Sequence, residues 1–225
     1  MAIGLACGWE VETAGDPQRP GYDSIMAGFR EGIFLNGTVG SGKTTVADCI
    51  GEALEVLGIA HAIIDLDAIR RAWPTPKEDR FNHELELVNL AALVNNYTGA
   101  GIEAFVIAGV IEDASEVKRY SRALGGRPLR VYRITASEGV IRTRLMKRHQ
   151  GDPKRLGWHL ARSVELENIL INESLDDVVL DSTDRTPESV AREILELAGV
   201  RPMQRDQGVA GVLGVQERPR ESREA

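Results

Sequence analysis

The sequence has few aromatic residues, few cysteines and no long apolar run. Phe, Trp and Tyr together make up 5% of its 225 residues. Two cysteines, Cys7 and Cys49, are too few for a disulfide framework, so we expect a reducing compartment, the cytoplasm. No apolar run approaches the length of a membrane-spanning helix, and no basic region followed by a long apolar stretch opens the chain. We therefore expect neither a membrane protein nor a disulfide-stabilised secreted domain.

The signals of several other functional classes are also missing. The four histidines do not have the spacing of metal ligands, and neither a G-x-S-x-G elbow nor a C-x-x-C pair is present. A formal net charge of −7 disfavours a general nucleic-acid binder, because clustered lysines and arginines hold phosphate backbones. The exception is residues 142–162, with seven Lys or Arg residues and one acid, Asp152. We therefore expect a small anionic ligand, with no nucleic acid and no membrane as partner.

The order of apolar patterns predicts one α/β domain at residues 31–200, between an irregular arm at 1–30 and a disordered, charged tail at 201–225. Continuous apolar runs are typical of parallel strands covered on both faces. They predict strands at 32–36, 60–65, 104–109, 129–135 and 178–181. Helical spacing predicts helices at 43–57, 84–98, 113–124, 137–149, 158–172 and 187–198. This alternation predicts a five-stranded parallel sheet with helices on both faces.

The strongest signal lies between the first predicted strand and the first predicted helix. Residues 37–44 read Gly-Thr-Val-Gly-Ser-Gly-Lys-Thr, a complete G-x-x-x-x-G-K-[ST] phosphate loop. Backbone N–H groups of such a loop surround a polyphosphate, and the helix N-terminus adds partial positive charge. We expect Lys43 to contact the β- and γ-phosphates of ATP and the Thr44 hydroxyl to hold Mg²⁺. The predicted nucleotide-binding residues are Gly37, Thr38, Val39, Gly40, Ser41, Gly42, Lys43, Thr44 and Thr45.

Two acids follow the second predicted strand. Asp65 and Asp67 are expected beside the phosphate loop, because ligands of a parallel sheet sit at the carboxyl ends of its strands. A carboxylate there either holds Mg²⁺, the role we predict for Asp65, or accepts a proton from an attacking hydroxyl, the role we predict for Asp67. Asp67 also suits the cap of a short helix at 68–72. Arg70, one turn later, is either a ligand for an anionic acceptor or a surface arginine.

The acceptor side is less clearly marked. Asn82, Asn89 and Asn96 are seven residues apart and so share one helix face. That face either lines the acceptor site, with Asn89 as the substrate-binding candidate, or meets water. Trp73 and Phe81 bound a polar loop, where they either stack on a substrate ring or anchor the loop.

The third predicted strand carries only a weak Walker B signal. Glu112 and Asp113 come later than a Walker B aspartate should, and Ala108 occupies the nearer position. Acids also suit the first turn of a helix, which is the alternative for both.

The basic stretch at 142–162 combines a helix, a polar loop at 151–155 and a second helix. Phosphoryl transfer needs cations on the γ-phosphate oxygens and the exclusion of water, which a closing lid provides. Arg144 and Arg148, spaced i and i+4, reach the same side of their helix and are the predicted catalytic cations. Arginines on a solvated helix face are the alternative.

Together these features resemble the small P-loop kinases: adenylylsulfate, shikimate and gluconate kinases and the chloramphenicol phosphotransferase-like enzymes. The resemblance covers residues 32–198. Besides the phosphate loop, residues 65–70 are similar to the D-G-D-x-x-R stretch of adenylylsulfate kinases, with Leu66 replacing glycine, and residues 144–148 to an R-L-x-x-R lid helix. The resemblance implies the three-layer P-loop NTPase sandwich with a helical lid. It also implies that Lys43 and Thr44 bind phosphate and Mg²⁺, that Asp67 is the acceptor-side carboxylate, and that Arg144 or Arg148 contacts nucleotide.

The leading hypothesis is an ATP-dependent, Mg²⁺-requiring kinase that phosphorylates a hydroxyl of a small metabolite or antibiotic. Lys43, Asp67 and the lid arginines carry the chemistry in this hypothesis. The rival is a nucleotide-dependent switch or regulatory ATPase without a small acceptor, which the absence of an N-K-x-D guanine motif disfavours. A third hypothesis is a nucleotide-binding protein that has lost catalysis. The longer acceptor motifs of the named kinases are absent, so the acceptor itself is not identified.

Overall fold

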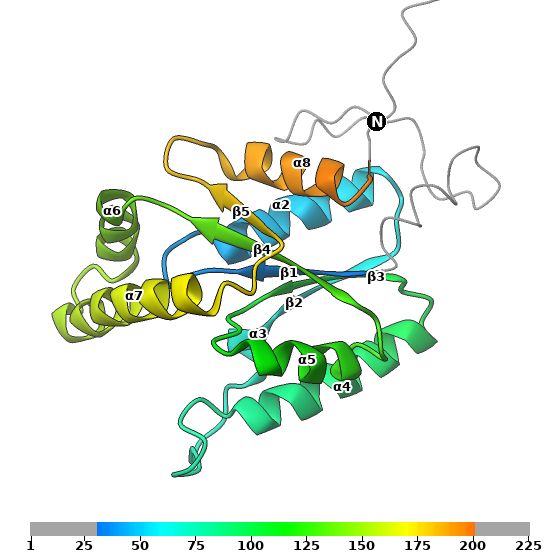
Figure 1. The fold of residues 1–225 in the computed structure, drawn as a ribbon, viewed down its shortest axis with the longest axis horizontal. Coiled ribbons are helices and arrows are strands. Elements are labelled where there is room, and N and C mark those ends of the chain that lie inside the picture. The colour runs from blue at the N-terminus through cyan, green and yellow to red at the C-terminus, as the bar shows by residue number, and fades with distance from the viewer. Residues whose placement is uncertain (1–30, 201–225) are drawn as a thin grey trace, which may run out of the picture.

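A five-stranded parallel sheet forms the centre of the computed structural model, which describes residues 31–200 (Figure 1). The predicted arm at 1–30 and tail at 201–225 lie outside the described residues. The strands are β1 (Gly32–Asn36), β2 (His61–Asp65), β3 (Ala104–Ala108), β4 (Leu129–Thr135) and β5 (Val178–Asp181). Their order is β2-β3-β1-β4-β5, and every neighbouring pair is parallel. The predicted parallel α/β fold is confirmed.

Helices cover both faces of the sheet, as Figure 1 shows. They are α2 (Lys43–Val56), α3 (Leu66–Ile69), α4 (His83–Gly99), the 3-10 turn η1 (Ala114–Glu116), α5 (Val117–Ala123), α6 (Glu138–Arg148), α7 (Pro153–Glu173) and α8 (Pro187–Leu197). Helices α2 and α8 lie on one face, and α4 and α5 on the other, while α6 and α7 stand beyond one end of the strands. None of the helices within residues 31–200 is both long and apolar enough to span a bilayer.

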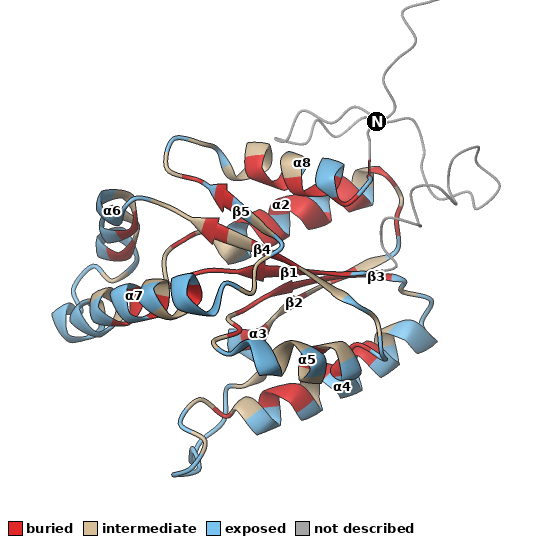
Figure 2. Cartoon of the chain, in the orientation of Figure 1, coloured by how far each residue is buried: buried red, intermediate tan, exposed pale blue. Residues whose placement is uncertain are grey.

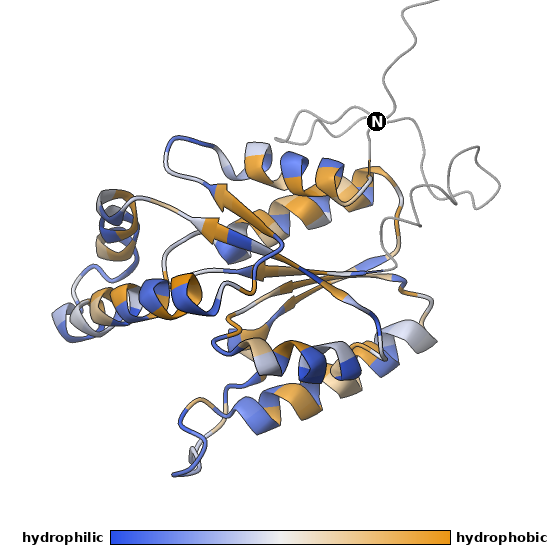
Figure 3. Cartoon of the chain, in the orientation of Figure 1, coloured by the Kyte–Doolittle hydropathy of each residue, from blue (hydrophilic) through white to orange (hydrophobic). Residues whose placement is uncertain are grey.

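The sheet separates two apolar clusters, and β1 contributes to both. Ile33 and Leu35 point into the cluster with α2 and α8, whereas Phe34 between them points into the cluster with α4 and α5. This alternation follows from the two-residue period of a strand. Because both faces are covered, all five residues of β1 are buried, and the buried colour runs along the central strands in Figure 2. The same strands are mostly apolar in Figure 3, as expected for central parallel strands.

Three helix starts differ from the sequence prediction. The helix predicted at 113–124 begins as the 3-10 turn η1, and α5 itself begins at Val117. Helix α7 begins at Pro153 rather than at 158, because Asp152 caps it by accepting the Arg155 N–H at 2.9 Å and proline suits the first helical turn. The predicted loop at 151–155 is therefore partly helical. The short helix predicted at 68–72 spans Leu66–Ile69, and its cap is Asp65 rather than Asp67.

The strand register brings the chemically important residues to one edge of the sheet. Ala108 of β3 is level with Asp65 of β2 on one side and with Leu35 of β1 on the other. The phosphate loop leaves β1 just after Leu35, so Asp65 and this loop share the carboxyl edge of the sheet. This is the edge where parallel α/β proteins bind ligands.

Candidate active site

The phosphate loop joins β1 to α2 and needs glycine at both of its ends. Gly37 has φ 143°, and a Cβ there would lie 2.4 Å from the carbonyl oxygen of Ile134. Gly42, just before α2, has φ 104°. L-residues rarely adopt either conformation. Asn36 fixes the start of the loop, because its buried side-chain oxygen accepts the N–H groups of Gly37 at 3.0 Å and of Ile111 at 3.3 Å.

Lys43 lies across the phosphate loop, with its ammonium group held by the loop itself. Its Nζ donates to the carbonyl oxygens of Gly37 at 2.8 Å and Thr38 at 2.9 Å. Burial lowers the pKa of Lys43 to about 8, although the nearby carboxylates of Asp67 and Asp65 act in the opposite direction. A bound polyphosphate would bring negative charge to the ammonium group and favour its charged form.

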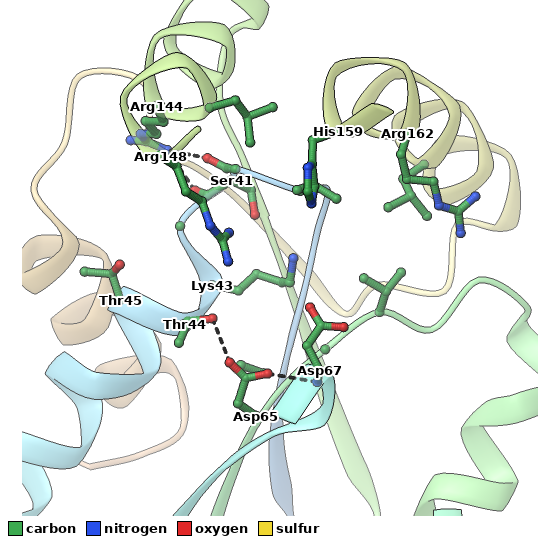
Figure 4. Close-up of a pocket in the computed structure, with 18 of the residues that line it drawn as sticks. Ser41, Lys43, Thr44, Thr45, Asp65, Asp67, Arg144, Arg148, His159 and Arg162 are labelled. Atoms are coloured by element: carbon green, nitrogen blue, oxygen red, sulfur yellow. Dashed lines mark hydrogen bonds between the residues drawn. The ribbon is translucent and has the colours of Figure 1, made fainter. Parts of the chain in front are cut away.

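Thr44 and Asp65 form a pair of oxygen ligands at the mouth of the loop. The Thr44 hydroxyl donates to a carboxylate oxygen of Asp65 at 3.3 Å (Figure 4). Within residues 31–200 no group of three His, Cys, Asp or Glu side chains is arranged to hold a metal. Mg²⁺ does not require one, because it commonly uses one or two protein oxygens and completes its shell with water and substrate phosphates. The Thr44–Asp65 pair therefore fits the predicted Mg²⁺ site.

The Asp67 carboxylate lies beside the ammonium group of Lys43 in Figure 4. Its side chain is 71% exposed, so a substrate hydroxyl has access to it. The guanidinium of Arg70, one turn later, is 23% exposed and forms an ion pair with Asp67. The second guanidinium nitrogen of Arg70 lies 3.1 Å from Glu86. Arg70 is thus a partly buried, doubly paired arginine rather than a free surface side chain.

The two predicted lid arginines have different surroundings. Arg144 donates to the Ser41 carbonyl at 2.8 Å and to the Ser182 carbonyl at 3.2 Å, so it braces the back of the phosphate loop. Among the described residues, Arg148 has no hydrogen-bond or ion-pair partner, and Figure 4 shows it extending from α6 toward Lys43. Of the two predicted lid arginines, Arg148 is therefore the one whose guanidinium has no partner within residues 31–200.

Three guanidinium groups lie near the aromatic ring of Phe81 on the acceptor side. The guanidinium carbons of Arg80 and Arg162 lie 5.0 Å from its ring centroid, and that of Arg70 lies 6.0 Å away. Arg162 belongs to α7 and is paired with Glu112. Phe81 is therefore a cation-binding platform that links α7 to the acceptor side.

Two further candidates, Asp113 and Trp73, do not line the cavity. Asp113 caps η1 by accepting the Ser115 N–H at 2.8 Å, so it starts a helix rather than a Walker B site. The side chain of Trp73 is 92% exposed and does not line the cavity.

The three asparagines do not act as one substrate-binding face. Asn82 donates to the carbonyl oxygens of Arg70 at 2.9 Å and Ala72 at 3.2 Å. Asn89 donates to the Ile69 carbonyl at 2.7 Å and does not line the cavity. Asn96 is exposed. The first two hold the backbone that follows Asp67, a supporting contribution that their spacing did not indicate.

Lys43, the two aspartates Asp65 and Asp67, and the two lid arginines face one cavity of about 820 Å³, which is within the usual range for a ligand site. Most of the predicted residues line it, while Gly37 and Thr38 lie beneath it as carbonyl partners of Lys43. Its wall holds three acids and eight cations, the latter being Lys43, Arg70, Arg71, Arg144, Arg148, Arg155, Arg162 and Arg185. Arg185 lies outside the basic stretch, and no sequence signal marked it. The cavity is suited to anionic ligands in a chain of net negative charge.

A histidine beside the site should make stability depend on alkaline pH. The carboxylates of Glu86 and Glu116 raise the pKa of His83 to about 9, and its Nε2 lies 2.7 Å from Glu116. The stabilisation from charged His83 is complete below the ordinary histidine pKa and is lost as pH rises through about 9. Since His83 is partly exposed, we expect a loss of about 1–2 kcal/mol in the free energy of unfolding.

Urea unfolding at pH 7 and pH 10 measures this effect. The His83→Gln variant should lose less stability between the two pH values than the wild type does. His61→Gln is the control, because the His61 ring hydrogen-bonds the carbonyl of Ile59. Equal losses in wild type and His83→Gln would contradict the assignment.

Comparison with known proteins agrees with this geometry. A family model described as an AAA domain matches residues 33–192. A probable adenylyl-sulfate kinase of Pyrococcus abyssi is 28% identical over 182 residues, which cover 77% of this chain and 96% of that protein. The structure of the Deinococcus radiodurans tunicamycin resistance protein has a TM-score of 0.55 and 21% identity, over 76% of this chain and 97% of that one.

A gluconokinase structure from Sinorhizobium meliloti has a TM-score of 0.51 and 24% identity, over 76% of this chain and 92% of that one. At these identities the two structures support the fold alone. The resemblance to small P-loop kinases is confirmed, since the family match, the sequence relative and the fold agree. Because the family model spans more than half of the sequence, the chain belongs to the P-loop family that this AAA domain describes.

Proposed function

We propose that this protein is an ATP-dependent kinase that transfers the γ-phosphate to a hydroxyl group of a small acceptor. The observation that carries the proposal is the meeting of two half-sites in one cavity. Lys43 and Thr44 form the phosphate side, and Asp67, which lies beside Lys43 in Figure 4, forms the acceptor side together with Arg70, which lines the same cavity. A regulatory ATPase needs the first half but has no need of an exposed carboxylate facing it.

Each residue has a defined part in the proposed reaction. Asp67 accepts the proton of the acceptor hydroxyl, whose oxygen forms a bond to the γ-phosphorus while the bond from that phosphorus to the β–γ bridging oxygen breaks. Lys43 and Arg148 stabilise the negative charge on the phosphate oxygens during transfer. Thr44 and Asp65 would hold Mg²⁺, which supplies further positive charge to the β- and γ-phosphates when bound.

We further propose that the acceptor is an anion. Arg70, Arg71 and Arg162 line the acceptor side of the cavity. Among residues 31–200, the acids that line this side are Asp67 and Glu112, and Glu112 is paired with Arg162. The Pyrococcus abyssi relative is named for adenylyl sulfate, a compound that carries negative charge. Arg70 and Arg162 already have carboxylate partners, whereas Arg71 is exposed and has none among residues 31–200, so a neutral sugar or polyol would leave Arg71 without a charge partner.

A panel of hydroxylated acceptors tests the proposal. ADP formation is measured with MgATP and matched pairs of compounds that differ only in a carboxylate, sulfate or phosphate group. We expect at least one anionic compound to raise the rate of ADP formation above the acceptor-free rate. The increase with its neutral partner should be at least tenfold smaller, because a charge-assisted hydrogen bond to a guanidinium contributes about 1.5–3 kcal/mol. Equal stimulation by both members of each pair would refute the anionic acceptor, and stimulation by none would refute the kinase.

A further inference from the structure

A fully buried carboxylate lies behind the acceptor side of the cavity. Glu86 is in the first turn of α4, and its side chain is 0% exposed. One carboxylate oxygen accepts the Tyr120 hydroxyl at 2.5 Å, and the other lies 3.1 Å from the guanidinium of Arg70. His83, one turn before it, lies 3.7 Å from the first oxygen. Glu86 is thus held from three sides, and it does not itself line the cavity.

The position of Glu86 is one where an apolar residue would be expected. Its neighbours on the same buried face of α4, Leu87 and Leu90, belong to the apolar cluster beneath the sheet. Removing a carboxylate from water is costly, and a buried ion pair often adds no stability over apolar residues of the same size. A contribution other than stability is therefore the better explanation for this charge.

Arg70 connects the buried carboxylate to the cavity. One nitrogen of its guanidinium faces Glu86 and another faces Asp67, so the planar group spans both. Within residues 31–200, Arg70 is the sole side-chain partner of the Asp67 carboxylate. Because Asp67 is exposed and has this one partner, Arg70 sets the orientation of its carboxylate. The orientation of the Arg70 guanidinium is set in turn by Glu86. The contacts form a chain from Tyr120 through Glu86 and Arg70 to Asp67.

We propose that Glu86 is a positioning residue for phosphoryl transfer, which fixes Arg70 so that the Asp67 carboxylate faces the phosphate loop. This inference rests on the proposed kinase function. Glu86 touches no substrate and acts only through Arg70. The contribution is geometric, and small displacements of a catalytic group are costly, about 10²-fold in rate for about 1 Å.

The kinetic test uses Glu86→Gln, which keeps the shape of the side chain and removes its charge. We expect kcat for transfer to fall about 10–100-fold, with little change in the KM for ATP or in acceptor-independent ATP hydrolysis. Glu84→Gln is the matched control, since Glu84 is two residues earlier on α4, is 67% exposed and pairs with Arg119. A KM for ATP that rises with no change in kcat would overturn the proposal.

A double-mutant cycle shows whether Glu86 acts through Arg70. Arg70→Lys keeps the positive charge but cannot span two carboxylates as a planar fork. If the proposal is correct, adding Glu86→Gln to Arg70→Lys lowers kcat by less than threefold further, because the connection is already broken. If the two substitutions lower kcat independently, so that their fold-losses multiply in the double variant, the proposal is overturned. Should Glu86→Gln not fold, Tyr120→Phe, which removes the hydroxyl that holds Glu86, replaces it in the same cycle.

A structural readout separates this inference from the kinase proposal. The exchange rate of the Arg70 side-chain N–H protons with water, measured by NMR, reports how firmly the guanidinium is held without any acceptor. We expect exchange to accelerate at least tenfold in Glu86→Gln and to stay unchanged in Glu84→Gln. An unchanged rate in Glu86→Gln overturns the positioning of Arg70 even in an active kinase. Faster exchange in a protein without transfer activity would refute the kinase proposal alone.

Discussion

Replacing Lys43 with alanine is expected to lower acceptor-dependent ATP turnover about 10²–10³-fold. The side chain lies over the phosphate loop, and its ammonium group donates to two loop carbonyls. Removing it takes away a cation that, in the proposed reaction, stabilises the charge on the γ-phosphate oxygens during transfer. Steady-state ADP formation measures the change.

The matched control for this variant is Lys118→Ala. Lys118 is exposed on α5 and does not line the cavity. Its substitution should leave kcat and the KM for ATP within about twofold of wild type, in keeping with the small effects of surface substitutions away from functional features. A Lys43→Ala enzyme within tenfold of wild type would contradict the phosphate-loop mechanism.

The second large effect is expected for Asp67→Asn. An asparagine has nearly the same shape but cannot accept the hydroxyl proton, so transfer to the acceptor should fall about 10²–10⁴-fold. ATP binding should persist, because the phosphate loop is intact. Nucleotide affinity is measured by calorimetry, and transfer by acceptor-dependent ADP formation.

Asp184→Asn is the control for Asp67→Asn, since Asp184 is exposed and does not line the cavity. Its rate of transfer should match wild type. Activity of Asp67→Asn within about tenfold of wild type would rule out Asp67 as the essential base. A parallel loss of ATP affinity would instead indicate that Asp67 belongs to the nucleotide side of the site.

Features encoded by neighbouring residues were predictable from the sequence. The phosphate loop is contiguous, and its strand and helix flanks follow from local apolar patterns, so β1 and α2 were predicted within one residue of their observed ends. The start of α7 had a local signal too, an aspartate followed by proline, which was interpreted as loop.

Features that depend on tertiary contacts were not predictable in the same way. Arg144 and Arg148 are one helical turn apart and look equivalent in the sequence, yet one is bound to Ser41 and Ser182 and the other is unpaired among the described residues. Glu86 is sixteen residues from Arg70 and thirty-four from Tyr120, and no periodicity relates them. Only the packing of α4 against α3 and α5 brings these three side chains together.

The central claim is that the γ-phosphate of ATP moves to an acceptor hydroxyl rather than to water. The measurement is the fate of label from γ-labelled ATP, followed with the anionic acceptor that gives the greatest stimulation. The account predicts that most of the label released from ATP appears as a phosphate ester of the acceptor, and that Asp67→Asn abolishes this product. Label recovered as inorganic phosphate, in equal amounts with and without acceptor, would contradict it.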